Sequence, residues 1–227
     1  MGRTRQVYYD IFSRFYDRFV ALHSRDKQGL ARKFLVDQVP VQESGRVLDL
    51  CTGTGTLLSY LQEKVGPDGY VVGVDFSRGM LERARQKTKG VDHVILVEAD
   101  ASHLPFRNNT FDVVTCSHAF YELKGEVRDR ALQEIVRVLR PHGVFLMMEH
   151  DVPANRFVRA LFYIRMISMG TGRAITFLRR EQGLLKRYFH SVTKVLAPAG
   201  RSKVLICRKD TRAAFNQKED MAEHLPS

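Results

Sequence analysis

The fold is decided by residues 46–55, RVLDLCTGTG. The first five form a short apolar run that predicts a strand, and the glycines after it predict a tight turn before a helix over residues 56–65. Gly53 and Gly55 carry no Cβ, so the backbone there can approach a ligand closely, and the helix behind the turn presents its free N–H groups to that ligand. Strand, glycine turn and helix together predict the opening of a nucleotide-binding βαβ unit.

An acidic residue follows the next predicted strand. Residues 70–74 form that strand, and Asp75 stands at its end, twenty residues past Gly55. A carboxylate at this place can accept both ribose hydroxyls of an adenosine group. Two departures weigh against NAD without excluding it, because Cys51 replaces the first glycine of the dinucleotide fingerprint and Leu58 replaces its third small residue.

The further elements before residue 150 alternate between strands and helices. They are strands over residues 94–98, 111–116 and 144–149, and helices over residues 78–89 and 127–139. Because each strand is nearly continuous in apolar residues, we expect an α/β fold with a parallel sheet covered on both faces. Asp100 and Ser117 follow the third and fourth strands, at the edge where open α/β sheets bind ligands.

The length of 227 residues fits one domain, with four predicted parts. These are N-terminal helices over residues 7–22 and 28–39 within 1–40, a core over 46–149, a basic part over 151–209 and a polar, flexible tail over 210–227. The basic part contains two helical segments near residues 156–169 and 175–187, then strands over 192–196 and 203–207. The turn signal Pro-Ala-Gly between those strands predicts an antiparallel pair.

Charge is distributed unevenly along the chain. The sequence has 36 Lys and Arg against 25 Asp and Glu. Residues 151–209 contain 13 of the basic residues and only Asp151 and Glu181 as acids, so this part accounts for the whole net charge of +11. Such asymmetry indicates an anionic partner, which is a membrane surface, a nucleic acid or an acidic substrate. The alternative is a solvated basic face without a partner.

Neither the cysteines nor the apolar runs indicate a secreted or membrane-spanning protein. The three cysteines, at 51, 116 and 207, are too few and too scattered for a disulfide framework or a structural zinc site, so we expect no metal. The N-terminus has no apolar segment of the kind found in secretory signals, and the longest apolar runs are about five residues, far short of the roughly 20 that span a bilayer. The expected location is cytoplasmic, either free or peripheral on the inner face of a membrane.

Five runs carry a resemblance to a known family. They are VLDLCTGTG, VVGVDFS, EADASHLPF, NNTFDVVTCSHAFYEL and LQEIVRVLRPHGVFLMME, within residues 46–149. Together they resemble the class I S-adenosylmethionine-dependent methyltransferases, and among these the ubiquinone/menaquinone-biosynthesis C-methyltransferase group. The resemblance implies a Rossmann-like, doubly wound, mostly parallel sheet of seven strands with an antiparallel last strand, and it implies S-adenosyl-L-methionine as the cofactor.

The resemblance also implies a role for individual residues. The loop with Asp49, Cys51, Thr52, Gly53 and Gly55 would surround the methionine part of the cofactor. Asp75 would hold the ribose, Phe76 and Met80 would pack near the adenosine, Asp100 and Ala101 would face the adenine, and the Ser117 carbonyl would accept from the ammonium group. The N-terminal run YYDIFSRFYD is similar to the family's lid helix, which would place Tyr16 over the cofactor.

Methyl transfer from a sulfonium is an in-line displacement with a neutral leaving group, so it needs alignment and a water-poor site above all. A base matters only if the acceptor must lose a proton. His118 and Tyr121 are the predicted catalytic residues, since both follow the fourth strand. The alternative for His118 is a wall of the substrate pocket or a cap. Glu122, Glu149 and His150 are further candidates at this rim.

The acceptor is predicted from residues 157–169, which are apolar except for Arg159 and Arg165. Such a segment suits an apolar substrate or docking on an anionic bilayer, and core packing is the alternative. The predicted acceptor is therefore a small molecule, apolar or lipid-associated, such as a quinone-ring precursor or a phospholipid headgroup. Two other functions stay open, a nucleic-acid methyltransferase and a non-catalytic cofactor-binding regulator or NAD enzyme. Ser-His-Ala-Phe after the fourth strand argues against nucleic acid, because base-methylating enzymes carry a Pro-Pro-aromatic motif there.

Overall fold

The computed structural model describes residues 10, 13, 29–168, 174–198 and 202–209. The predicted helix over residues 7–22, with Tyr16, and the predicted tail over residues 210–227 therefore lie outside the described residues, apart from Asp10 and Ser13.

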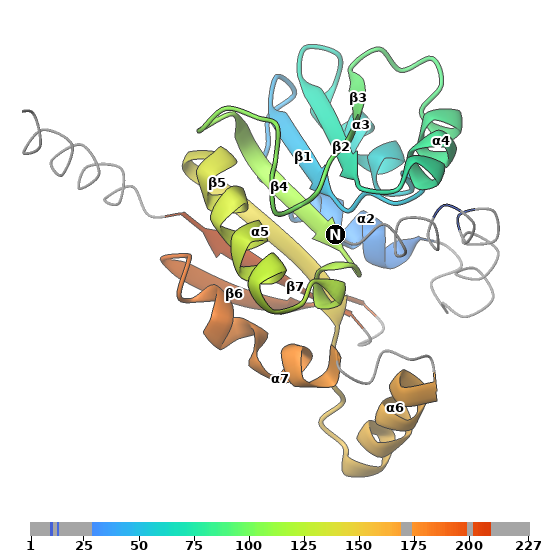
Figure 1. Cartoon of the computed structure of the whole chain (residues 1–227), viewed down its shortest axis with the longest axis vertical. Helices are drawn as coiled ribbons and strands as arrows, with labels where there is room; N and C mark the ends of the chain where they lie inside the picture. The colour runs from blue at the N-terminus through green and yellow to red at the C-terminus, as the bar shows by residue number, and fades with distance from the viewer. Residues whose placement is uncertain (1–9, 11–12, 14–28, 169–173, 199–201, 210–227) are drawn as a thin grey trace, which may run out of the picture.

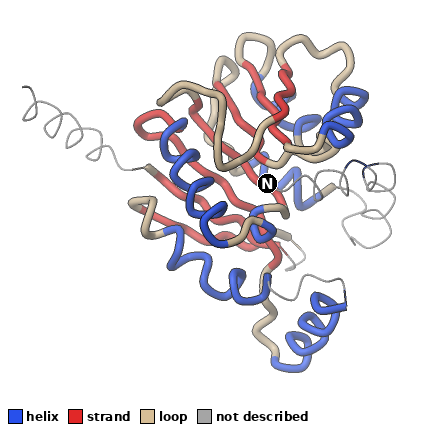
Figure 2. The backbone as a smooth tube through the Cα atoms, viewed as in Figure 1, coloured by secondary structure: helices blue, strands red, loops and turns tan. Residues whose placement is uncertain are grey.

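A seven-stranded sheet forms the centre of the molecule, in the order β3-β2-β1-β4-β5-β7-β6 (Figures 1 and 2). The strands are β1 (Arg46–Leu50), β2 (Tyr70–Asp75), β3 (Val94–Glu98), β4 (Phe111–Ser117), β5 (Leu139–His150), β6 (Ser191–Leu196) and β7 (Ser202–Arg208). The five strands from β1 to β5 pair in parallel, whereas β7 is antiparallel to both β5 and β6. This confirms the predicted mostly parallel sheet with an antiparallel last strand.

Two hydrophobic cores lie on opposite faces of the sheet. Along β1, Val47 belongs to the core under α2 (Leu30–Asp37), α3 (Leu58–Val65) and α4 (Arg78–Lys87). Leu48 and Leu50 belong to the other core, under α5 (Gly125–Val138) and α7 (Ala174–Leu185). Successive side chains of a strand point to opposite faces, so a strand buried on both faces must be continuously apolar. The central strands meet this requirement.

The edge strand β3 is not buried on both faces. Ile95 on β3 is half exposed, and the outer residues of this strand are only partly buried. The expectation that every strand is covered on both faces is therefore wrong for β3. A strand at the edge has one neighbour in the sheet, and α4 is the helix that packs against it.

The predicted boundary between the last helix and strand of the core is also wrong. Helix α5 ends at Val138, and β5 begins at Leu139 rather than at residue 144. Leu139 pairs with Phe111 and Val144 with Val113, so residues 140–143 bulge opposite a single residue of β4. The Arg140 side chain pairs with that residue, Asp112, at 2.7 Å. Pro141 and Gly143 thus mark a bulge within the strand and not the turn that precedes it.

The parallel strands place their carboxyl ends at one edge of the sheet. The chain leaves β1 toward β2 and β3 on one side, and later adds β4 and β5 on the other side. This reversal between β1 and β4 is the switch point at which open α/β sheets bind ligands. After β5, helix α6 (Arg156–Ser168) stands at the periphery of the molecule (Figure 1). None of the described helices is both long and apolar enough to cross a bilayer.

The two glycines of the first turn should respond differently to substitution. A Cβ on Gly55, whose φ is 74°, would lie 2.8 Å from the Ala84 Cβ of α4, whereas a Cβ on Gly53, whose φ is 56°, would meet no atom within 4 Å. We expect Gly55→Ala to lower the free energy of unfolding by about 2–4 kcal/mol, from overpacking and backbone strain together. Gly53→Ala should cost about 1–2 kcal/mol, from strain alone. Urea unfolding of both variants measures this, and equal losses would contradict the packing role of Gly55.

Candidate cofactor and acceptor site

Asp49 braces the glycine loop from beneath. Its buried carboxylate accepts hydrogen bonds from the Thr52 hydroxyl at 2.6 Å and from the Thr115 hydroxyl of β4 at 2.8 Å. Burial raises the pKa of Asp49 to about 6, against the effect of both hydroxyls. The Thr52 amide donates to the Val74 carbonyl at 2.9 Å, which ties the loop to β2. The structure therefore gives Asp49 and Thr52 a bracing role within the loop.

The backbone of the loop is in the left-handed region at three places. Cys51, Gly53 and Gly55 have φ values of 56°, 56° and 74°. Such a φ is uncommon for a residue with a Cβ, and strained residues gather at functional sites. Gly53 borders open space, while Gly55 is packed against α4. Of the two predicted glycines, Gly53 is thus the one with room for a ligand at its backbone.

Asp75 connects the loop to α4. One carboxylate oxygen, Oδ2, accepts from the Gly53 amide at 2.9 Å, and the other, Oδ1, accepts from the Ser77 amide at 2.9 Å. Burial raises the pKa of Asp75 to about 6, and these backbone N–H groups oppose the rise. The carboxylate therefore lies at the carboxyl end of β2, between the glycine loop and the first turn of α4.

The other predicted adenosine contacts surround this carboxylate. Phe76 is half-buried beside Asp75, and Met80 is buried within α4. The Asp100 carboxylate accepts from the Ser102 amide and hydroxyl at 2.9 and 2.8 Å, and Ala101 between them is buried. The Ala99 amide donates to the Asp75 carbonyl at 3.1 Å, so the turn after β3 is attached to the end of β2. The sequence-predicted residues thus lie along one edge.

The end of β4 holds the predicted catalytic histidine. Ser117 pairs with Met148 of β5, and the His118 amide donates to the Met148 carbonyl at 2.8 Å. His118 has a φ of 52°, and its buried Nδ1 atom has no hydrogen-bond partner among the described residues. Burial, with a smaller effect of His150, lowers the pKa of His118 well below its usual range. The imidazole is therefore neutral near pH 7.

Aromatic rings from four elements meet next to His118. The His150 ring at the end of β5 lies 4.7 Å from the His118 ring, 6.2 Å from the Tyr121 ring and 6.3 Å from the Phe162 ring, between centroids. Tyr121 belongs to the short 3-10 helix η1 (Phe120–Glu122), and Phe162 belongs to α6. We call these four residues the aromatic wall. The sequence did not indicate Phe162 as part of it, because only the fold brings α6 to the end of β5.

A buried polar cluster supports the wall from below. Glu149 accepts from the Tyr121 amide at 3.1 Å through Oε1, while its Oε2 atom is buried and has no hydrogen-bond partner in the part of the chain that the structure describes. Lys203, opposite Glu149 in the sheet, forms an ion pair with Glu181 of α7 and lies 3.8 Å from Asp151. Burial raises the pKa of Glu149 well above its usual range and that of Glu181 to about 7. Glu149 thus holds η1 in place instead of lying at the rim.

These features fit an adenosine cofactor that carries a reactive group. Asp75, which we call the ribose acid for its predicted role, lies at the carboxyl edge with the backbone of Gly53 and the turn after β3. The aromatic wall lies farther along the same edge. The described residues contain no group of three His, Cys, Asp or Glu side chains that could hold a metal ion. The fold and the site together define a class of protein, a doubly wound α/β domain with a nucleotide-type cofactor site at its switch point.

Part of the chain matches known methyltransferases. Residues 47–143 match the family described as a methyltransferase domain. Demethylmenaquinone methyltransferases of Staphylococcus aureus strains JH9 and Newman are 37% identical over 141 residues, which is 62% of this chain and 58% of the relative. The chain therefore aligns with less than two thirds of the length of these relatives.

Solved structures agree on the fold. An S-adenosylmethionine-dependent methyltransferase from Aquifex aeolicus is 19% identical, with a TM-score of 0.60 over 85% of this chain and 97% of that one. The CurJ carbon methyltransferase is 17% identical, with a TM-score of 0.57 over 77% of this chain and 51% of that one. The likeness to these structures shows the fold, and residues 47–143 match the methyltransferase domain family, for which the resemblance implies S-adenosylmethionine as the cofactor.

Substitution of the ribose acid should weaken cofactor binding. We expect Asp75→Ala to reduce affinity for S-adenosylhomocysteine by about 1.5–3 kcal/mol, because charge-assisted hydrogen bonds to the ribose are lost. Calorimetric titration measures this, with Asp68→Ala in an exposed turn as the matched control. Unchanged affinity would contradict the ribose assignment.

The same carboxylate predicts a pH dependence. The ionised Asp75 carboxylate accepts hydrogen bonds from the ribose hydroxyls more strongly than the protonated acid does. The pKa of Asp75 is about 6 in the free protein. Affinity for S-adenosylhomocysteine should therefore rise between pH 5 and about pH 6 and level off above it. Titrations across this range test the sign, and an affinity that falls with rising pH would exclude Asp75 as the responsive group.

Proposed function

We propose that this chain transfers the methyl group of S-adenosylmethionine to the ring of an apolar, lipid-like small molecule. The observation that carries the proposal is the aromatic wall beside the cofactor edge, formed by His118, Tyr121, His150 and Phe162. Planar rings stack favourably on such side chains, which favours a ring over a phospholipid headgroup as the acceptor. The named activity of the Staphylococcus aureus relatives supports a quinone-type ring.

S-adenosylmethionine would supply an electrophilic methyl group on a sulfonium, whose carbon–sulfur bond breaks as the bond to the acceptor forms while sulfur keeps the electron pair. The residues of this chain would align the methyl donor with the acceptor and exclude water from the site. Asp75 would orient the adenosine end, the Gly53 backbone would hold the methionine part, and the aromatic wall would exclude water from the acceptor side. Alignment of this kind is the largest contribution a protein can make to a transfer with a neutral leaving group.

His118 would orient the acceptor in this mechanism. Its buried Nδ1 has no hydrogen-bond partner within the described ranges, and its neutral ring can accept a hydrogen bond from a ring hydroxyl. Because the pKa of His118 is lowered, its imidazole is a weak base. We therefore assign His118 to positioning the acceptor hydroxyl. Tyr121 would form the adjacent wall on the η1 backbone that Glu149 holds. Methyl transfer to a ring carbon leaves the ring with a positive charge, and the ring then loses its proton to water, so no strong base is needed at His118.

The activity can be tested by offering the chain two alternative acceptors. Methyl-labelled S-adenosylmethionine is incubated with the chain and either reduced demethylmenaquinone or anionic phospholipid vesicles, followed by partition into organic solvent. We expect label in the quinone product alone. Label in the phospholipid would replace the ring by a headgroup. Oligonucleotides are tested as acceptors in a parallel assay. If the chain binds the cofactor but labels none of the three acceptors, a non-catalytic regulator remains as the function.

His118→Ala should separate binding from turnover. We expect turnover with the quinone acceptor to fall about 10–100-fold, because a positioning hydrogen bond is lost, while affinity for S-adenosylhomocysteine stays within about twofold. His142→Ala, in the exposed bulge of β5, is the matched control. A full rate in His118→Ala would make the residue a bystander.

We further propose that residues 156–187 dock on an anionic bilayer surface, which would bring the chain to the inner face of a membrane. Helix α6 carries large apolar side chains that face solvent, with Phe157 83%, Leu161 67% and Ile164 63% exposed. Met166 is instead buried in the core, and Phe162 packs against that core beside His150. One face of α6 would therefore contact the acceptor site while the other enters the lipid interface.

Charge complementarity favours an anionic bilayer as the occupant of this face. Arg156 and Arg159 lie on α6, Arg179 and Arg180 are exposed on α7, and no acid occurs between Asp151 and Glu181. Each such cation near an anionic surface contributes about 1 kcal/mol, and exposed apolar side chains add to binding when they insert. A second copy of the chain would gain from the apolar face alone and not from this charge.

Flotation with vesicles tests the docking. We expect the chain to float with phosphatidylcholine vesicles that contain phosphatidylglycerol, and to float less without it or at high salt. Charge reversal of Arg156, Arg159 and Arg165 should abolish flotation, and Phe157→Ser with Leu161→Ser should weaken it. Leu196→Ser removes an exposed apolar side chain of β6 and is the matched control. Persistent flotation of the charge-reversed chain, or self-association through α6, would contradict the proposal.

A further inference from the structure

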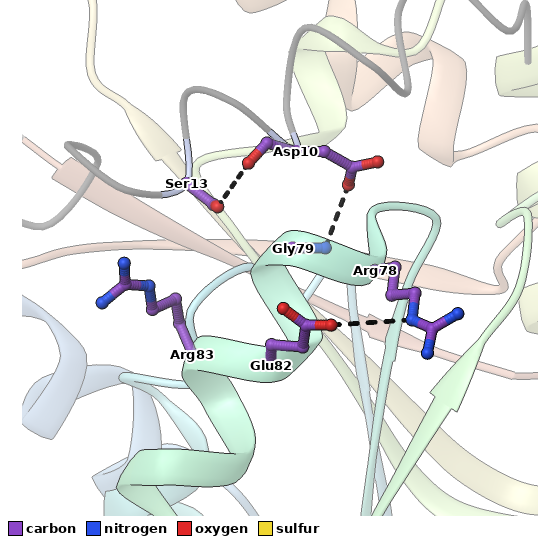
Figure 3. Close-up of a pocket in the computed structure, with 6 residues that line it drawn as sticks. All are labelled: Asp10, Ser13, Arg78, Gly79, Glu82 and Arg83. Carbon is purple, nitrogen blue, oxygen red and sulfur yellow. Dashed lines mark hydrogen bonds and ion pairs between the residues drawn. The ribbon is translucent and has the colours of Figure 1, made fainter.

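The first turn of α4 contacts a residue from far away in the sequence. The Asp10 carboxylate accepts through Oδ1 from the Ser77 hydroxyl at 2.6 Å. The same oxygen accepts from the Gly79 amide at 3.0 Å (Figure 3). A hollow of about 250 Å³ adjoins this contact, and its lining consists of Asp10, Ser13, Arg78, Gly79, Glu82 and Arg83. This contact was not predicted from the sequence, since 67 residues separate Asp10 from Ser77.

The contact has a close fit that only glycine permits at position 79. A Cβ on Gly79 would lie 2.8 Å from the Asp10 carbonyl oxygen and 2.9 Å from both the Asp10 Cα and the Ser13 hydroxyl. That hydroxyl donates to the Asp10 carbonyl at 2.7 Å. Backbone, side chain and the missing Cβ thus all shape the place where Asp10 meets α4.

A chain of hydrogen bonds joins this contact to the cofactor loop. Ser77 is fully buried; its hydroxyl donates to Asp10 and accepts from the Met80 amide at 3.2 Å. The Ser77 amide donates to Asp75, whose other oxygen accepts from Gly53. Asp10 is therefore connected through one residue to the ribose acid, and through two residues to the backbone that borders open space.

Asp10 also acts on Asp75 through its charge. Burial is the main cause of the raised pKa of Asp75, and the nearby Asp10 carboxylate raises it further. The other acids that face Asp75 are Asp49 on β1 and Glu98, its register partner on β3. The N–H groups at the start of α4 compensate for the anionic charge of Asp10, because a helix N-terminus favours negative charge.

We infer that Asp10 is a positioning residue of the cofactor site, which fixes Ser77 and through it the Asp75 carboxylate. Binding of the ribose at Asp75 and docking of Asp10 on α4 then strengthen one another, and by linkage the two effects are equal in size. This inference rests on the proposed function only in requiring that the adenosine cofactor binds at Asp75.

Titration of S-adenosylhomocysteine into six forms of the full chain tests the inference. We expect Asp10→Ala to lower affinity about tenfold, since the orientation of Ser77 is lost, and Asp68→Ala in an exposed turn, the control, to change it less than about twofold. Asp10→Asn keeps an acceptor oxygen for Ser77 and Gly79, so it should restore affinity near pH 7. Gly79→Ala should reproduce Asp10→Ala, and the double variant should lose no more than either single one.

The pH profile distinguishes positioning from a purely structural effect. Asp10→Asn removes the charge that raises the pKa of Asp75, so the rise of affinity with pH should move to lower pH than in the unchanged chain. Equal affinities of Asp10→Ala and the unchanged chain, or an unmoved profile in Asp10→Asn, would overturn the inference and leave the proposed function intact. No binding of S-adenosylhomocysteine by the unchanged chain would overturn both. The Asn variant keeps the test decisive if Asp10→Ala does not fold.

Discussion

The rest of the site depends on the hydrogen bonds of the Asp75 carboxylate. This group accepts hydrogen bonds from the amides of Gly53 and Ser77, so it joins the glycine loop after β1 to the first turn of α4. The two segments belong to different βα units, and Lys87 of α4 also joins them by donating to the Thr54 and Thr56 hydroxyls at 2.9 Å each. Burial raises the pKa of this acid to about 6, which means that the fold keeps an ionisable group at a place where ionisation is unfavourable. The cost is offset when a ligand donates hydrogen bonds to the carboxylate.

Local patterns were sufficient to predict the central fold. Strands such as β1 and β2 are continuous apolar runs buried on both faces, and the glycines and Asp75 follow them at positions that only a ligand-binding βα turn requires. The antiparallel β6–β7 pair was predicted from its turn residues. The bulge at residues 140–143 was not, because Pro141 and Gly143 are equally typical of a turn before a strand. Only the pairing of Leu139 with Phe111 distinguishes the two arrangements.

The site was predicted in part for the same reason. Residues that directly follow strands, such as Asp75, Asp100 and His118, were placed at the correct edge from chain order alone. The roles of Gly55, Glu149 and Asp10 were missed because each depends on an element distant in sequence. Gly55 packs against Ala84, Glu149 holds the Tyr121 backbone, and Asp10 meets Gly79. Each of these contacts holds a residue or segment that the sequence did identify. What sequence reasoning missed is therefore mainly the set of residues that position the predicted site residues.

The central claim is that the carboxyl edge holds an adenosine cofactor at Asp75 with its reactive end toward the aromatic wall. The most direct measurement is a crystal structure of the chain with S-adenosylhomocysteine. The account predicts both ribose hydroxyls within hydrogen-bond distance of the Asp75 carboxylate, the adenine beside Asp100 and Ala101, and the sulfur facing the His118 side. A ligand whose ribose contacts another residue, while Asp75 is bonded only to Gly53 and Ser77, would contradict it.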